Sequence, residues 1–409
     1  MMHFAMNQRL IACLDFFLGN GYRLLGPKRN NGNARKEKEE NVPAHFCLSQ
    51  ITGTARIRDH SDWRTANIFV CADIWLDIFA FIVPGQLGLK LALLSNRFDC
   101  LVDKHFKTRK WALGKLEIRK RKVDEFVQIV KRVKNGRLQW LPMPQQPLPN
   151  SLVGFNEIIV RYVDQSVIEF LDQILRNVGA NITLLPNIYS YFYSKKSWHI
   201  FIHQIWPMLK PNISRMMLDG ESHMMINSDN FFQLRRHLSP AVLRECANLR
   251  SIDSDHLFPT GGAADDSIGT TNGKALSKWL HTPRGDGRPK VLKSNAWRMP
   301  GVVTKTFKEL KEAFVNASSS VSYVVRVDAY LEHMEPFVVE NRVTRECLTL
   351  HRARGDAWIM ERGPIGRDEQ QRAVWTREAM EKNWPNLLHF EFGDRDIGPL
   401  SPVEPSKGE

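Results

Sequence analysis

The chain has 409 residues, of which 43% are hydrophobic and 25% charged, and its formal net charge is +13. This length allows two or three domains, and the composition is that of a globular chain that can bury a core. No apolar run reaches the roughly 20 residues that a membrane-spanning helix needs, so we expect no membrane partner. The positive charge keeps nucleic acid open as a partner.

The six cysteines are scattered along the chain, at Cys13, Cys47, Cys71, Cys100, Cys246 and Cys347. They form no CxxC pair and no short spacing typical of a disulfide framework or a zinc site. This usage indicates free thiols in a reducing compartment, so we expect a soluble protein of the cytoplasm, the nucleus or both. An apolar run at residues 10–18 contains Asp15 and lacks a small-residue cleavage site, which argues against a secretory signal.

The N-terminal third divides into an irregular region, 1–70, and a helical module, 71–107. Residues 26–40 are rich in Gly, Asn, Lys and Glu and cannot bury a core, so the first region is expected to be partly disordered. In the module, Pro84-Gly85 separates a short helix from a longer one that begins near Gln86. The stretch 73–103 holds more large apolar side chains than thirty residues can cover. The rest of the chain or a partner must cover them.

Residues 108–141 are expected to form short strands, although an amphipathic helix over 123–130 is an alternative. Asn135-Gly136 separates two apolar runs, which is typical of a β-hairpin. The region is also basic, with thirteen Lys and Arg against three acidic residues between positions 104 and 137. It therefore carries a second hypothesis, a nucleic-acid surface with Trp111 and Trp140 as stacking residues.

Beyond a Pro-rich linker at 142–151, where we place a domain boundary, residues 152–330 alternate between strands and helices. Strands are predicted at 155–162, 213–219, 249–253, 289–293 and 321–327, and helices at 166–178, 239–246, 272–280 and 306–314. This rhythm is similar to leucine-rich repeats and predicts an irregular strand–helix solenoid. Residues 331–398 alternate in β fashion and are expected to form a small C-terminal sheet, and 399–409 a disordered tail. The fold class is thus α+β or α/β.

Several segments resemble catalytic or metal-binding motifs but lack a residue or a spacing that the chemistry needs. The segment 269–275 is one residue too short for a phosphate-binding loop and has Ala275 where magnesium needs a hydroxyl, so we read it as a loop before a helix. His199 and His203 lie one helical turn apart without a third ligand nearby. Ser254-Asp255-His256 cannot form a triad from adjacent residues, and Asp265-Asp266 is read as a solvated turn. We expect a non-enzyme with no cofactor and no metal.

The helical module resembles the F-box, the docking module of SCF-type ubiquitin ligases. The resemblance rests on Ile78-Phe79, Phe81, Val83-Pro84, Leu87, Leu89, the run from Leu91 to Phe98, and Leu101-Val102-Asp103. The family's usual Leu-Pro pair at the start is replaced by Ile74-Trp75. More weakly, the whole chain resembles the large F-box families expanded in nematodes, partly through the segment 279–289.

This resemblance implies a substrate-recognition subunit of a Skp–cullin–F-box complex that binds a Skp-family adaptor, through it a cullin, and a target protein. The adaptor-binding residues that it implies are Trp75, Leu76, Phe79, Phe81, Pro84, Leu87, Leu91, Leu94 and Phe98. Two alternatives stay open beside the nucleic-acid hypothesis. The module could be only a core helical hairpin, or the chain could be a repeat scaffold without a ligase role.

Overall fold

The structure is a computed structural model that describes residues 54–56, 65–67, 70–82, 87, 91–121, 126–132, 138–144, 148, 151–189, 196–218, 230–255, 257–260, 264–297, 300–331 and 334–400. Of the regions discussed above, most of 1–70, residues 83–86 with Pro84, residues 88–90, Asn135-Gly136, part of the linker 142–151, His256 and 401–409 lie outside these residues. The contacts divide the chain into two units. The helical unit is Met1–Lys110 with Val133–Asn135, and the sheet unit is Trp111–Arg132 with Gly136–Glu409.

The helical unit is built on two packed helices, α2 (Ala72–Phe79) and α4 (Asn96–Thr108), with the 3-10 turn η3 (Ala92–Leu94) before α4. Ser95 begins α4 as its N-cap, because its side-chain oxygen accepts a hydrogen bond from the Phe98 amide at 3.3 Å. Two short antiparallel strands, β1 (Thr54–Arg56) and β2 (Thr65–Asn67), precede the helices.

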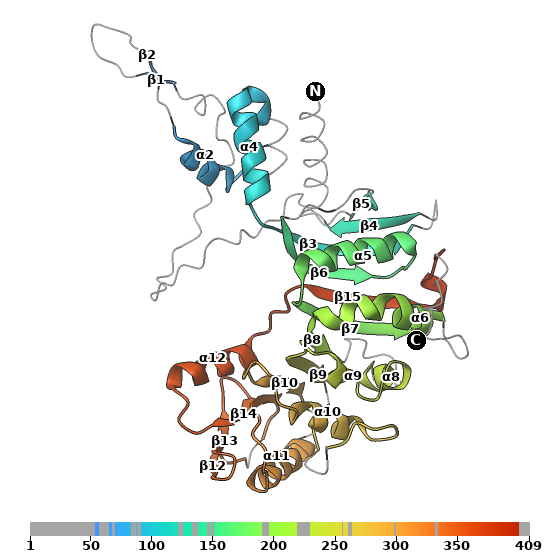
Figure 1. Cartoon of the computed structure of the whole chain (residues 1–409), viewed down its shortest axis with the longest axis vertical. Coiled ribbons are helices and arrows are strands. Elements are labelled where there is room, and N and C mark those ends of the chain that lie inside the picture. The colour runs from blue at the N-terminus through green and yellow to red at the C-terminus, as the bar shows by residue number, and fades with distance from the viewer. Residues whose placement is uncertain are drawn as a thin grey trace. The chain divides into compact units, whose positions relative to one another are not determined.

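The sheet unit is a mixed α/β fold with one sheet of thirteen strands (Figure 1). The strands, in chain order, are β3 (Trp111–Lys120), β4 (Val127–Arg132), β5 (Leu138–Pro142), β6 (Leu152–Val160), β7 (Ile182–Tyr189), β8 (Ile213–Met217), β9 (Ser251–Asp255), β10 (Lys290–Asn295), β11 (Tyr323–Asp328), β12 (Phe337–Asn341), β13 (Glu346–Arg352), β14 (Ala357–Pro364) and β15 (Leu387–Gly393). Their order in the sheet is β12-β13-β14-β11-β10-β9-β8-β7-β15-β6-β3-β4-β5.

The eight strands from β11 to β3 in this order run parallel, and the strands at both ends are antiparallel. The expected strand–helix alternation is therefore present, and consecutive strands from β7 to β11 are neighbours. The strand interpretation of 108–141 is also what the structure has, since β4 and β5 pair antiparallel. The predicted linker does not separate two sheets: β3, before it, pairs with β6, after it.

The helices of the sheet unit lie between its strands along the chain, except that η6 follows the last strand, β15. They are α5 (Gln165–Val178), α6 (Lys196–Ile200), η4 (Phe201–Ile205), α7 (Trp206–Leu209), η5 (Lys210–Asn212), α8 (Asn230–His237), α9 (Val242–Glu245), α10 (Asn272–Leu280), α11 (Pro300–Val315), α12 (Glu369–Met380) and η6 (Asp394–Asp396). The match to the predicted helices is closest for α5 and α10. The helix predicted at 239–246 is only one turn long, and α11 begins six residues earlier than expected.

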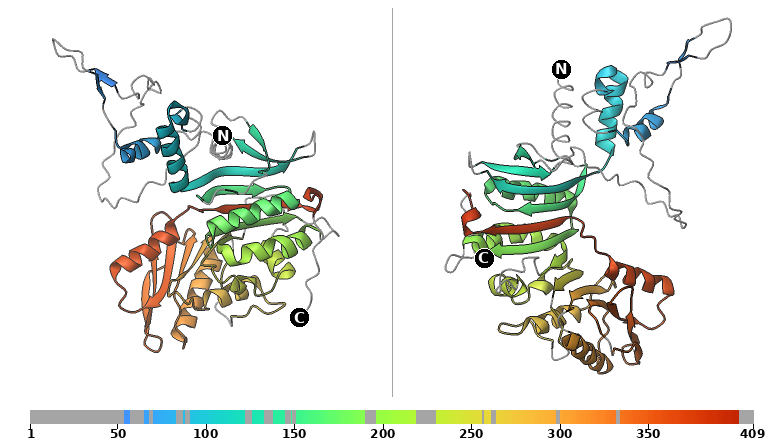
Figure 2. Two further views of the ribbon diagram at one scale, coloured as in Figure 1. Left: turned by 45° about the horizontal axis from the view of Figure 1, so that its top comes forward. Right: turned by 180° about the vertical axis from the view of Figure 1, so that it is seen from behind.

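The predicted small C-terminal sheet is not separate, because β14 pairs with β11 and extends the main sheet. The strand β15 returns to the other half of the sheet and inserts between β6 and β7 (Figure 2, red). Its inward side chains Leu388, Phe390 and Phe392 are fully buried. Neither α12 nor β15 was predicted from the sequence.

The helices α10 and α12 lie on opposite faces of the sheet. Successive side chains of a strand point to opposite faces. In β10, Lys290 donates to the Trp279 carbonyl of α10, whereas Lys293 donates to the Glu381 carbonyl after α12. Val291, on the same face as Lys293, packs with Trp375 and Ala379 of α12. We call this second face the α12 face.

Candidate functional site

Among the residues of the helical unit that the structure describes, five large apolar side chains are exposed, and we call them the docking surface. They are Ile74 (52% exposed), Ile78 (38%), Phe81 (81%), Leu93 (61%) and Leu94 (50%). The first three follow one another at spacings of four and three residues, which aligns them along one side of α2 and its following turn. The other two belong to η3. Isolated exposed apolar residues are ordinary on protein surfaces, but five in one small unit make a candidate binding surface.

A neighbouring side of α2 is held by an aromatic cluster against α4. Trp75 meets Phe98 edge-on with ring centroids 4.9 Å apart, and Phe79 lies 5.8 Å from the His105 ring. Such edge-to-face contacts add to the burial of the rings themselves. Burial, and then the charge of Arg109, lower the pKa of His105 to about 4, so its imidazole is neutral at physiological pH. This cluster fixes which side of α2 stays exposed.

The structure divides the nine adaptor-binding residues that the F-box resemblance implies. Four of them, Trp75, Phe79, Leu87 and Leu91, are buried within the protein and so stabilise the fold instead of offering contact area. Phe81 and Leu94 are exposed on the docking surface, and Leu76 and Phe98 are half-buried. Pro84 lies outside the described residues. Ile74, Ile78 and Leu93 were not in the set, although the i, i+4 spacing of the two isoleucines could have marked them.

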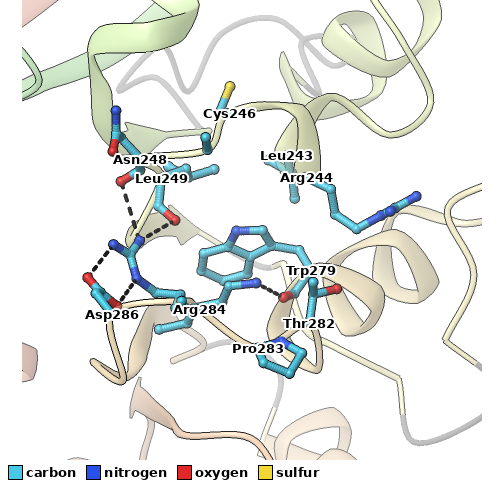
Figure 3. Close-up of a pocket in the computed structure, with 13 residues that line it drawn as sticks. Leu243, Arg244, Cys246, Asn248, Leu249, Trp279, Thr282, Pro283, Arg284 and Asp286 are labelled. Atoms are coloured by element: carbon cyan, nitrogen blue, oxygen red, sulfur yellow. Dashed lines mark hydrogen bonds and ion pairs between the residues drawn. The ribbon is translucent and has the colours of Figure 1, made fainter.

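In the sheet unit, a pocket of about 420 Å³ lies beside the helix α10 and the segment that follows it (Figure 3). Apolar walls come from Leu243, Leu249, Trp279 and Pro283, and the polar lining includes Arg244, Asn248, Thr282, Arg284, Asp286 and Lys290. The segment 279–289, singled out in the sequence for its family likeness, thus forms one wall of a cavity.

Arg284 is fixed at the rim of this pocket by neighbours on two sides (Figure 3). Its guanidinium pairs with the Asp286 carboxylate, with the closest contact at 2.8 Å, and donates to the Leu249 carbonyl at 3.1 Å. Arg244 makes a comparable two-point pair with Asp266. Asp266 is therefore almost fully buried and structural, which corrects its interpretation as part of a solvated turn.

Lys290 is the buried cation of the pocket. Its ammonium donates to the Trp279 carbonyl and lies 5.0 Å from the centre of the Trp279 ring. Burial, followed by the charges of Arg284 and Arg244, lowers the pKa of Lys290 to about 7. An anion bound in the pocket would raise the pKa of Lys290 and so oppose the effect of the two arginines on it. Burial raises the pKa of the neighbouring Cys246 thiol to about 12, which keeps it protonated and unreactive.

A strip of charged side chains covers the α12 face at the other end of the sheet, which we call the charged strip. It consists of Lys115, Glu117, Arg119, Glu157, Arg161, His389 and Glu391, contributed by β3, β6, β15 and the residue after β6. Lys115 pairs with Glu157 at 2.6 Å, and Arg161 bridges Glu117 and Glu391. The hydrogen bond from His389 and the pairing with Lys115 lower the pKa of Glu157 although burial opposes them.

The same contacts bear on the nucleic-acid hypothesis for residues 104–137. Lys115 and Arg119 have carboxylate partners, and Lys131 is buried. Burial lowers the pKa of Lys131. Of the proposed stacking residues, Trp140 is partly exposed. Part of the positive charge counted in the sequence is thus neutralised or covered in the fold.

The other segments that resembled catalytic or metal-binding motifs belong to ordinary secondary structure. Residues 269–275 lead into α10, whose N-cap Thr271 accepts from the Lys274 amide, as expected. The rings of His199 and His203 lie 4.5 Å apart. Among the described residues there is no group of three or more His, Cys, Asp or Glu that could hold a metal ion, and no helix long and apolar enough to cross a membrane.

Comparison with protein-family models, with curated proteins and with solved structures gave no match. The functional assignment therefore depends on the residues and surfaces described above.

Proposed function

We propose that this chain is the substrate-recognition subunit of an SCF-type ubiquitin ligase, in which the helical unit binds a Skp-family adaptor. The observation that carries the proposal is the docking surface on α2 and η3, which exposes Ile74, Ile78, Phe81, Leu93 and Leu94. The adaptor would link the chain to a cullin, and the sheet unit would hold a target protein. The chain itself performs no chemistry, since it acts by bringing the target near the transferring enzyme.

The docking surface has the chemistry of a helix that binds in an apolar groove. Complete burial of one large apolar side chain is worth about 1.5–3 kcal/mol, so these five, exposed by about half, would release roughly 4–8 kcal/mol. Association itself costs several kcal/mol. The half-buried residues Leu76 and Phe98 must therefore add contacts, and both also belong to the set that the F-box resemblance implies.

The sheet unit supports the second half of the proposal. Its parallel strands present a continuous face, as the strands of leucine-rich repeats do, and repeat proteins bind their ligands across such faces. Over β10 and β11 this face is covered by α12. Over β3, β6 and β15 it carries the charged strip, whose Lys115 and Arg119 side chains are 64% and 40% exposed. We propose the charged strip as the surface that contacts the target.

The docking surface can be tested by charge substitutions and direct binding. Ile78→Asp and Leu93→Asp place a carboxylate on the surface without touching the aromatic cluster. Each should weaken binding to a purified Skp-family adaptor at least about tenfold, because a buried unpaired charge costs more than 1.4 kcal/mol. Binding is measured by titration of the full chain with the adaptor.

Two control variants separate docking from folding. Ile268→Asp changes an exposed isoleucine of the sheet unit and should leave the affinity unchanged. Leu87→Asp changes a fully buried leucine and should lower the stability of the helical unit as well as adaptor binding. A wild-type chain that does not bind the adaptor, or folded docking-surface variants with wild-type affinity, would refute the proposal.

A further inference from the structure

The largest of the pockets described here, about 860 Å³, lies on the α12 face at the β12 end of the sheet. Val338, Thr349 and Glu361 lie next to one another on the three antiparallel strands and form its floor. Glu369, Arg372, Ala373 and Thr376 of α12 form one wall, and the exposed side chain of Val338 adds apolar surface. The pocket is distinct from the docking surface and from the charged strip.

Arg367 lines this pocket, and its guanidinium is sandwiched in a fixed position. Its side chain is only 2% exposed, and its Cζ lies 4.3 Å from the centre of the Trp375 ring. On another side it approaches Gly363, where an added Cβ would lie 3.1 Å from Cζ and 3.0 Å from the Trp375 ring. Glycine at this strand position is what leaves room for the guanidinium.

None of the three guanidinium nitrogens of Arg367 has a hydrogen-bond acceptor among the residues that the structure describes. The Glu361 carboxylate lies 3.9 Å from Nη1, which is close enough for attraction but too far for a hydrogen bond. One oxygen of Glu361 accepts from the Thr376 hydroxyl at 2.8 Å. Burial lowers the pKa of Arg367 below its ordinary value. A buried donor group without acceptors is rare in folded proteins and costly to maintain, unless a ligand supplies the acceptors.

We propose that this pocket binds a ligand with a single carboxylate on an apolar body, and that Arg367 holds the carboxylate with two parallel N–H donors. The planar fork of a guanidinium matches a carboxylate in this way. A singly charged group fits better than a phosphate, because the lining residues Glu361 and Glu369 already balance Arg367 and Arg372. Val338 and Ala373 would pack on the apolar body. The carboxylate can belong to a peptide C-terminus or to a free small acid.

The test uses the full chain and matched pairs of probes that differ only at the acid group. One pair is 4-phenylbutyrate and its carboxamide, and the other is a short apolar peptide with a free or an amidated C-terminus. Binding is measured by titration with ligand-observed and protein-observed NMR. The carboxylate member of at least one pair should bind at least tenfold more tightly than its amide. Preference for the acid only in the peptide pair identifies a chain end as the ligand.

Three variants test the role of Arg367. Arg367→Met keeps the apolar stem beside Trp375 and should abolish the preference for the acid, and Gly363→Ala should reduce it by displacing the guanidinium. Arg354→Met changes an exposed arginine outside the pocket and should have no effect. Without ligand, Arg367→Met should be at least as stable as the wild type. Equal binding of acids and amides, no binding of any acid, or a destabilised Arg367→Met that keeps the preference would each overturn the proposal.

Discussion

At the scale of single residues, Lys290 shows how the fold changes the chemistry of a side chain. Its pKa falls from 10.5 to about 7 because it is buried, and because Arg284 and Arg244 lie near it. Between these two pH values the unfolded chain binds a proton that the folded protein does not hold. The free energy of unfolding contributed by this group therefore rises as the pH rises from about 7 to about 10.5.

Lys290→Met should remove this pH dependence and should make the protein more stable at neutral pH by roughly 1–3 kcal/mol. The gain is smaller than the whole pKa shift implies, because the pocket admits solvent. Urea denaturation at several pH values between about 7 and 10 measures both effects. Lys274→Met, at an exposed position of α10, is the matched control and should change stability by less than about 0.5 kcal/mol. A less stable Lys290→Met would mean that the hydrogen bond to Trp279 outweighs the cost of burial.

At the scale of elements, β15 enters the sheet through the side chain of Asn386. The Phe155 amide donates to its Oδ1 at 2.8 Å, and its Nδ2 donates to the Asn181 carbonyl at 2.9 Å. Asn386 has a φ of 53°, a conformation that asparagine tolerates better than most residues. Gly154 makes room for it, because a Cβ there would lie 2.8 Å from Oδ1. One residue thus joins the first half of β6 and the residue before β7 to the start of β15.

Asn386→Ala should lower the free energy of unfolding by about 2–4 kcal/mol, since two hydrogen bonds are lost at a buried position. Asn386→Gly relieves the backbone but loses the same bonds, so it should also be destabilising. Asn383→Ala, three residues earlier and exposed, should have little effect. The free energy of unfolding of each variant is measured by denaturant titration, and the comparison holds where the m-value equals that of the wild type. A variant at position 386 with wild-type stability would show that these bonds are replaced by water.

The elements that the sequence predicted well are those with a local signal. The apolar spacing of α5, the position of α10 and the pairing of β4 with β5 all depend on neighbours in the chain. The pairing of β15 with β6 and β7 depends on residues more than 190 positions away, and no local pattern encodes it. The predicted adaptor-binding residues mixed exposed and buried positions of α2, because most residues of this helix are apolar and their spacing does not separate its sides. The Arg367 pocket joins strands and a helix that only the fold brings together.

At the scale of the whole molecule, the two units have separate tasks in the proposed function, and the sheet unit is completed by a strand from far along the chain. β15 lies in the middle of the parallel strands, and it buries Leu388, Phe390 and Phe392. Complete burial of each is worth about 1.5–3 kcal/mol, which is a large part of the net stability of a typical domain.

A chain that ends at Lys382 should therefore fail to form the cooperative sheet, whereas one that ends at Leu400 keeps every described residue and should unfold like the full chain. Circular dichroism during thermal unfolding and size-exclusion chromatography distinguish the two outcomes. Native-like cooperative unfolding of the shorter chain would show that β6 and β7 can pair without the inserted strand. Adaptor binding by the helical unit is measured in parallel, and its survival in the shorter chain would show that the two units fold independently.

The central position of β15 also sets an order of events during synthesis. The end of β6 and the start of β15 are 227 residues apart, which a ribosome adding about 5–20 residues per second needs roughly 10–45 s to cover. For most of that interval the nascent chain has made β6 and β7 but lacks the strand that belongs between them. The unpaired backbone groups at the edges of these strands can pair with other chains and cause aggregation. The protein should therefore depend on chaperones until residues 387–393 have emerged.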